Sequence, residues 1–236
     1  MKSKLGAALV LMSILTATCD RGGDTAVALY FSETERGGEP FATRMLVTSK
    51  FLRIDYGVDT DDFILFDRKR PTIFSVNRND KTVLVIEPLP ITLAAPSPFE
   101  HSVEQDSAQA PAVGGKPVAR FRFKTNHTQC YDVFAAKDLL PDAVAALREY
   151  HETIAGQHAR AMEVTPKDMQ RACDLANYIF APTRHLAQGF PVRQQDIEGN
   201  TRQLVNYKEG FAVDPMLFRL PAEFKHYRAG ENRAPL

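Results

Sequence analysis

The sequence predicts an α+β protein in which an antiparallel β-sheet packs against two main helices. Between Thr43 and Glu87, short runs of β-branched and aromatic residues are separated by polar turns, a pattern typical of a β-meander. From Pro141 onward, apolar residues recur at three- and four-residue spacings, which indicates amphipathic helices. Strand patterns return after Gly189. A chain of 236 residues with 44% hydrophobic content can bury one sizeable core, so we expect a single domain over residues 25–228.

The first 19 residues are typical of an export signal peptide. Lys2 and Lys4 precede the apolar run Leu5–Leu15, which is too short for a membrane-spanning helix but has the length of a signal-peptide core. Residues 20–24 are Gly-rich and charged, as in a short tether, and residues 229–236 form a polar tail. We therefore expect an exported protein.

The end of the signal segment, residues 15–19, resembles the lipobox of bacterial lipoproteins, in which the cysteine becomes the lipid-modified first residue. The sequence departs from that family at Thr16 and Thr18, where the family prefers an aliphatic residue and a Gly, Ala or Ser. The resemblance implies lipidation of Cys19 and a membrane anchor on the periplasmic side of a bacterial envelope. The alternative is ordinary cleavage nearby, which gives a soluble periplasmic protein.

The cysteine count agrees with lipidation. In an oxidising compartment three cysteines leave one unpaired, whereas modification of Cys19 leaves the pair Cys130 and Cys173. Neither of these two has the spacing of a zinc site or of a Cys-x-x-Cys redox motif. We predict a disulfide between them.

The meander is expected to cover an apolar cavity. The runs Phe63–Phe66 and Val83–Ile86 carry apolar groups on both faces, so both faces of the sheet need cover. The helices offer small or polar residues at several positions, which leaves room for an apolar ligand. The alternative is that the carboxy-terminal segment completes the packing. The residues predicted to line the cavity are Leu52, Ile54, Tyr56, Phe63, Leu65, Val83, Val85, Leu147 and Ile154.

Residues 88–117 are predicted to form a long mobile loop, because they hold six prolines and few large apolar side chains. Strands are expected again over Val118–Lys124 and Gln129–Ala135, joined as a hairpin.

Two helices are expected after this hairpin. The first begins at Pro141 and carries a stripe that includes His151 and His158. These histidines lie two turns apart, roughly 10 Å along the axis, so they cannot share a metal ion and we interpret them as core or boundary residues. The second helix is expected to begin at Thr165, with Pro166 at its first position, and to reach Phe180 with Met169 on its buried face.

Six short motifs in residues 25–228 form a recognisable pattern. They are Arg53-x-Asp55, the turn at Asp67, Asn79-Asp80-Lys81, Cys130-Tyr131-Asp132-Val133, Gly189-Phe190-Pro191-Val192 and Asp214-Pro215-x-x-Phe218-x-Leu220-Pro221. With these motifs, residues 25–228 resemble a family of bacterial periplasmic proteins of unknown function that are themselves similar to the LolA/LolB lipoprotein carriers. The resemblance implies a strongly curved half-barrel sheet wrapped over the helices, with an apolar concavity of the kind that the carriers use for acyl chains. The loop 88–117 and the pair Cys130 and Cys173 are not features of the carriers.

The charge balance and the absence of known motifs exclude several classes of function. The 29 basic and 29 acidic residues cancel without forming a basic stripe, which argues against nucleic acid as a partner. The sequence holds no P-loop, dinucleotide or nucleophile-elbow motif, and Asp59–Asp62 lack the rest of a calcium loop, so we predict no cofactor, no metal and no enzymatic activity. The predicted function is a binding or carrier module for an apolar or acyl-chain ligand. The alternative is an envelope assembly or adaptor protein that binds another protein through a sheet edge or the long loop.

Overall fold

Twelve strands form one sheet, with one long helix and several short helical turns. The structure is a computed structural model that describes residues 25–59, 61–95 and 98–230. The strands are β1 (Thr25–Thr34), β2 (Phe41–Val47), β3 (Phe51–Asp55), β4 (Phe63–Asp67), β5 (Thr72–Asn77), β6 (Thr82–Ile86), β7 (His101–Val113), β8 (Lys116–Thr125), β9 (Thr128–Ala136), β10 (Phe190–Asp196), β11 (Thr201–Ala212) and β12 (Lys225–Arg228). The helical elements are α1 (Pro141–Glu163), α2 (Ala172–Leu175), the π turn η2 (Ala176–Phe180) and the 3-10 turns η1 (Lys167–Met169), η3 (Arg184–Gln188) and η4 (Pro215–Phe218).

The strand order in the sheet is β12-β6-β5-β4-β3-β2-β1-β11-β10-β9-β8-β7. The predicted meander is confirmed as β2 to β6, in which each strand pairs antiparallel with the next, and β1 extends it by pairing with β2. The hairpin predicted after residue 117 is confirmed as β8 and β9. All pairs are antiparallel except β12 with β6. The sheet stays open, with β12 and β7 at its two edges.

The predicted α+β class with two main helices is wrong, because the fold is dominated by its sheet. Only α1 is a long helix, and it begins at Pro141 as expected. The segment predicted as a second helix forms η1 instead, and Met169, expected to be buried, is 65% exposed. Gln170 explains the difference, since its side-chain amide donates to the carbonyl oxygens of Met162 and Thr165 and holds these residues in turns. Helix resumes only at α2 and η2.

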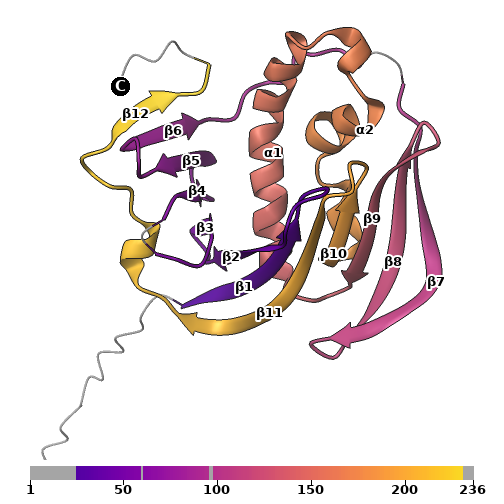
Figure 1. The fold of residues 1–236 in the computed structure, drawn as a ribbon, viewed down its shortest axis with the longest axis horizontal. Coiled ribbons are helices and arrows are strands. Elements are labelled where there is room, and N and C mark those ends of the chain that lie inside the picture. The colour runs from indigo at the N-terminus through magenta and orange to yellow at the C-terminus, as the bar shows by residue number, and fades with distance from the viewer. Residues whose placement is uncertain (1–24, 60, 96–97, 231–236) are drawn as a thin grey trace, which may run out of the picture.

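Figure 1 shows α1 standing within the curve of the sheet, with β3–β6 on one side of it and β8–β10 on the other. We call the face of the sheet toward α1 the concave face. Its core joins Leu29, Phe66 and Leu52 from the strands to Ala143 and Leu147 from α1.

The opposite, convex face of β1–β6 carries a second core. Phe63, Leu65 and Val83 pack there against the carboxy-terminal segment that contains η4. Phe218 of η4 is buried and stacks on Phe51, with ring centroids 5.7 Å apart. The carboxy-terminal segment therefore covers the second apolar face.

The prediction of a mobile loop over residues 88–117 is wrong for residues 101–113, which form a strand. His101–Val113 form β7, whose partner is β8. Before β7, Leu93 and Phe99 pack against buried residues of α1, α2 and η2. Apolar periodicity was missing because β7 is an edge strand with largely exposed side chains, and its pairing comes from β8.

The predicted disulfide between Cys130 and Cys173 is confirmed, with the two Cα atoms 5.2 Å apart. It ties β9 to α2. None of the described helices is both long and apolar enough to cross a membrane. The predicted signal segment, tether and lipidated Cys19 lie outside the described residues, as does most of the predicted tail 229–236.

Candidate functional site

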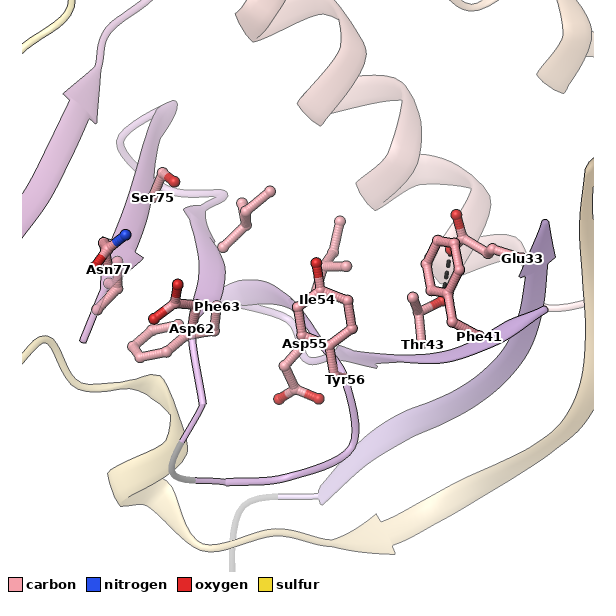
Figure 2. Close-up of a pocket in the computed structure, with 12 residues that line it drawn as sticks. Glu33, Phe41, Thr43, Ile54, Asp55, Tyr56, Asp62, Phe63, Ser75 and Asn77 are labelled. Carbon is pink, nitrogen blue, oxygen red and sulfur yellow. Dashed lines mark hydrogen bonds between the residues drawn. The ribbon is translucent and has the colours of Figure 1, made fainter. Parts of the chain in front are cut away.

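A hollow of about 440 Å³ opens on the concave face at the ends of β1–β5 (Figure 2). We call it the concave groove. Its lining residues come from five neighbouring strands and the turns beside them. They are Glu33, Phe41, Thr43, Ile54, Asp55, Tyr56, Asp62, Phe63, Ile64, Ser75, Val76 and Asn77.

The floor of the concave groove is a row of residues paired across three strands. Ile54 of β3 pairs with Ile64 of β4, which pairs with Ser75 of β5, and all three are partly buried. Two residues further along β4, Phe66 is covered by α1, whose Tyr150 meets it edge-on with ring centroids 5.9 Å apart. The floor is therefore the part of the concave face that α1 leaves open.

Two aromatic residues form the rim. Phe41 and Tyr56 are 37% and 57% exposed, and their ring centroids lie 6.5 Å apart. A neighbouring hollow of about 280 Å³ shares Phe41, Thr43 and Tyr56 with the concave groove and adds the exposed Val205. Exposed aromatic side chains beside a hollow offer apolar area to a ligand.

The polar groups of the concave groove lie at its ends. Glu33 accepts a hydrogen bond of 2.5 Å from the Thr43 hydroxyl, which Figure 2 shows as a dashed line. At the other end, the Asp62 carboxylate accepts the backbone N–H of Arg78 at 2.7 Å. The Asp55 carboxylate points to the opposite side of β3 from Ile54 (Figure 2). The Asp55 carboxylate therefore does not point into the groove.

Asp55 belongs instead to a buried ion network on the convex face. Asp55 receives two hydrogen bonds from Arg44, at 2.9 and 2.8 Å, and one from Arg53, at 2.6 Å. Arg44 also bonds Asp59 at 2.7 Å. Burial alone would raise the pKa of Asp55, but the hydrogen bonds from the two arginines outweigh it and hold that pKa below its ordinary value.

The network anchors the carboxy-terminal segment. Arg53 donates to the carbonyl oxygen of Leu217 at 2.7 Å, and its guanidinium lies over the Phe63 ring, 3.8 Å from the centroid. The sequence predicted Arg53-x-Asp55 only as part of a family resemblance and did not predict that the pair is buried. The signal was Arg53-x-Asp55, two opposite charges on one side of an otherwise apolar strand.

The nine residues predicted to line an apolar cavity lie on two faces of the sheet. Leu52, Ile54, Leu147 and Ile154 contact the concave core, whereas Phe63, Leu65, Val83 and Val85 contact the convex core. Of the nine, only Ile54, Tyr56 and Phe63 line the concave groove. The prediction of one cavity lined by all nine is wrong, because the apolar residues of β4 and β6 alternate between two covered faces.

The helix histidines are ring-packing groups. His151 meets His185 of η3 edge-on at 5.4 Å between centroids, and burial lowers the pKa of His151 to about 4. His158 lies 5.4 Å from the ring of Tyr178, and burial lowers its pKa as well. Among the described residues, no group of three or more His, Cys, Asp and Glu has the arrangement of a metal site.

Comparisons with known proteins give similarity at the level of shape. No family model and no curated protein sequence matches the chain. An uncharacterized conserved protein from Thermus thermophilus aligns with a TM-score of 0.45 and 9% identity, over 89% of this chain and 94% of that one. PNGF-II, in two crystal forms, aligns with a TM-score of 0.41 and 10% identity over 87% of this chain, which spans about a third of that protein. The resemblance to the LolA/LolB carriers stays a prediction.

Proposed function

We propose that this protein is a non-enzymatic binding or carrier module that holds an apolar, chain-like ligand in the concave groove. The observation that carries the proposal is an open hollow of about 440 Å³ floored by Ile54 and Ile64 and rimmed by Phe41 and Tyr56. Its volume falls within the range of roughly 300–1,000 Å³ typical of small-molecule sites. Because the floor is already formed by paired strands, ligand binding needs no rearrangement of the sheet.

We also propose that the module is exported and anchored through lipidated Cys19 on the periplasmic side of a bacterial envelope. The disulfide between Cys130 and Cys173 supports export, since such bonds persist in oxidising compartments. Metabolic labelling with an alkyne fatty acid tests the anchor. We expect the parent to be labelled and to fractionate with membranes, and Cys19→Ser to lose both properties. Equal labelling of the two proteins would refute the anchor.

A neutral probe tests the concave groove without involving charge. The fluorescent probe is a twelve-carbon alcohol with a fluorophore at the end of its chain. We expect saturable binding to the parent and loss of binding in Ser75→Trp, because the introduced indole fills the floor beside Ile64. The chain has no tryptophan of its own, so the emission of the indole also reports whether the variant is folded.

The matched control is Ser102→Trp, which places the same side chain on the exposed surface of β7. We expect this variant to bind the alcohol as the parent does. Absence of binding by the parent, or equal binding by a folded Ser75→Trp, would refute the concave groove as the ligand site.

The alternative function, an adaptor that binds a protein through a sheet edge, has one feature in its favour. β7 is a 13-residue strand at the edge of the sheet. However, Glu104 and Asp106 make ion pairs with Lys124 and Arg122 of β8, and Pro111 removes a backbone donor from β7. Charges and proline on an edge strand oppose the addition of another strand, so we favour the carrier.

A further inference from the structure

Arg202 lies on the concave face beside the groove and forms an ion pair with Glu33. It sits on β11 directly across from Glu33 of β1 in the strand register. Its guanidinium lies over the Phe31 ring, 4.2 Å from the centroid. Its Nε is 3.3 Å from a Glu33 carboxylate oxygen. Because Glu33 also lines the concave groove, Arg202 stands one side chain behind the groove wall.

The guanidinium of Arg202 has an unused capacity for hydrogen bonds within the described part of the chain. Its Nε is buried and lacks a partner there, since the Glu33 contact does not have hydrogen-bond geometry. A guanidinium carries five N–H donors in a rigid fork. Burial lowers the pKa of Arg202, yet 23% of its side chain is exposed. Arg202 is therefore mostly but not completely buried.

The surroundings of His185, which include Arg202, are basic. His185, which is 4% exposed, has a buried Nδ1 without a partner among the described residues. Burial, together with nearby His151, Arg184, Arg202 and Arg148, lowers the pKa of His185 to about 3. This region thus gathers three arginines around two histidines that burial keeps neutral.

The other two arginines bond to neutral acceptors. Arg184 donates to the Lys124 carbonyl oxygen at 3.0 Å and to Asn177 Oδ1 at 2.8 Å, and it contacts His101 Nδ1 at 3.0 Å. Arg148 donates to the Thr183 hydroxyl at 3.2 Å. Over the residues that the structure describes, Arg202 is the one of the three with a carboxylate in contact, and that carboxylate is the shared Glu33.

A mostly buried guanidinium that has a single carboxylate beside it has lost hydration without filling its donors, and an oxyanion that arrives with the ligand would supply hydrogen bonds to it. We propose that Arg202 binds the oxyanion head group, carboxylate or phosphate, of an amphiphile whose apolar chain lies in the concave groove. This inference rests on the proposed function and adds the head-group chemistry to it. The planar fork of arginine matches both oxyanions, and the Glu33 contact is made on the Nε side of that fork.

The contacts of Glu33 leave one edge of the Arg202 guanidinium for the head group. The Thr43 hydroxyl holds Glu33 from the strand on the other side of β1. Glu33 is thereby kept against the Nε side of Arg202. The oxyanion would approach the opposite edge of the fork, where two donors face the same direction.

Four probes with one chain and different heads test the proposal. Each carries the same fluorophore on a twelve-carbon chain that ends in an alcohol, a carboxylate, a phosphate or a trimethylammonium group. We expect the parent to bind the carboxylate and phosphate probes at least about tenfold more tightly than the alcohol, a factor that corresponds to one charge-assisted contact. The ammonium probe should bind no more tightly than the alcohol. The carboxylate and phosphate arms separate a fatty acid from a phospholipid as the source of the head group.

The decisive variant is Arg202→Met, which keeps an apolar stem over Phe31 and removes the charge. We expect it to bind the alcohol as the parent does and to lose the preference for the two oxyanions. The matched control is Arg193→Met, since Arg193 is exposed and lies 5.8 Å from the Phe134 ring centroid in a similar contact. This control should keep the full preference.

The outcomes distinguish a failure of the Arg202 proposal from a failure of the proposed carrier function. If the alcohol binds but the parent shows no preference for oxyanions, the carrier proposal stands and the role of Arg202 is refuted. An oxyanion preference that survives in Arg202→Met refutes that role as well. If no probe binds to the parent, the proposed function fails, and the inference fails with it.

Discussion

Replacing Asp55 with asparagine should destabilise the protein strongly, because it leaves Arg53 buried without its charge partner. The side chains of Arg53 and Asp55 are 1% and 0% exposed, and their closest atoms are 2.6 Å apart. Removing one partner of a buried ion pair costs about 3–5 kcal/mol. Arg44 keeps its contact with Asp59 at 2.7 Å, so we expect the lower end of that range, a loss of about 3 kcal/mol.

Urea denaturation followed by circular dichroism measures this loss. With a slope of about 2–3 kcal/mol per molar urea, the midpoint of Asp55→Asn should fall by about 1–1.5 M while the slope stays unchanged. The control is Arg70→Ala, which breaks the Arg70–Asp67 pair, where the arginine is 86% exposed; it should cost less than about 1 kcal/mol. If Asp55→Asn is no less stable than the control, the buried network does not stabilise the fold.

The same network predicts part of the acid sensitivity. Since the pKa of Asp55 is lower in the folded protein than in the unfolded chain, its contribution is present in full above the unfolded value of about 4. It is lost as the pH falls through the folded value. In Asp55→Asn, the stability difference from the parent should therefore shrink as the pH is lowered below about 4.

Three further predictions concern other parts of the fold. Replacing both Cys130 and Cys173 with alanine should cost about 4 kcal/mol in the chain-entropy model, given their sequence separation of 43; an unchanged urea midpoint would contradict this. Gly156→Ala would place a Cβ 2.0 Å from the carbonyl oxygen of Leu89, so we expect a loss of about 1–3 kcal/mol, and a thermal midpoint equal to that of the parent would show that this segment does not lie against α1. Burial lowers the pKa of His185 to about 3, so the unfolded chain takes up the proton first and stability should fall as the pH drops from about 6.5 toward 3. His185→Phe should flatten that fall, measured from urea midpoints between about pH 7 and pH 4, and an unaltered slope would argue against a buried neutral His185.

Local sequence patterns predicted the elements whose partners are close in the chain. The meander β2–β6 and the hairpin β8–β9 follow from alternating apolar residues and short polar turns. β7 could not be predicted in this way, because its exposed residues show no apolar alternation and its place comes from pairing with β8. The prediction of a second helix failed for a similar reason. The hydrogen bonds from the Gln170 side chain to the carbonyl oxygens of Met162 and Thr165 override a good helix-start signal.

The candidate site was predictable only in part. Alternation correctly placed Ile54 on the side of β3 that faces α1, and the surplus of apolar groups correctly indicated that both faces needed cover. The sequence left open whether the carboxy-terminal segment would complete the packing; Phe218 and its neighbours do so on the convex face, and the opening lies on the concave one. The role of Arg202 could not be predicted either. A charged residue in a strand is usually solvated, and its local sequence does not indicate that Arg202 is mostly buried.

The place of β11 in the sheet has a consequence for how the chain is assembled during synthesis. Thr25 at the start of β1 pairs with Ala212 at the end of β11, so the two halves of the sheet are joined by residues that emerge late, about 190 residues after β1 begins. Until then, β1 and β10 each present an open edge, and such edges are prone to pair with other chains. We expect a chain that ends at residue 200 to form two separate half-sheets and to aggregate, which light scattering would detect. Folding should therefore be slow and should finish only when β11 is inserted between its two neighbours.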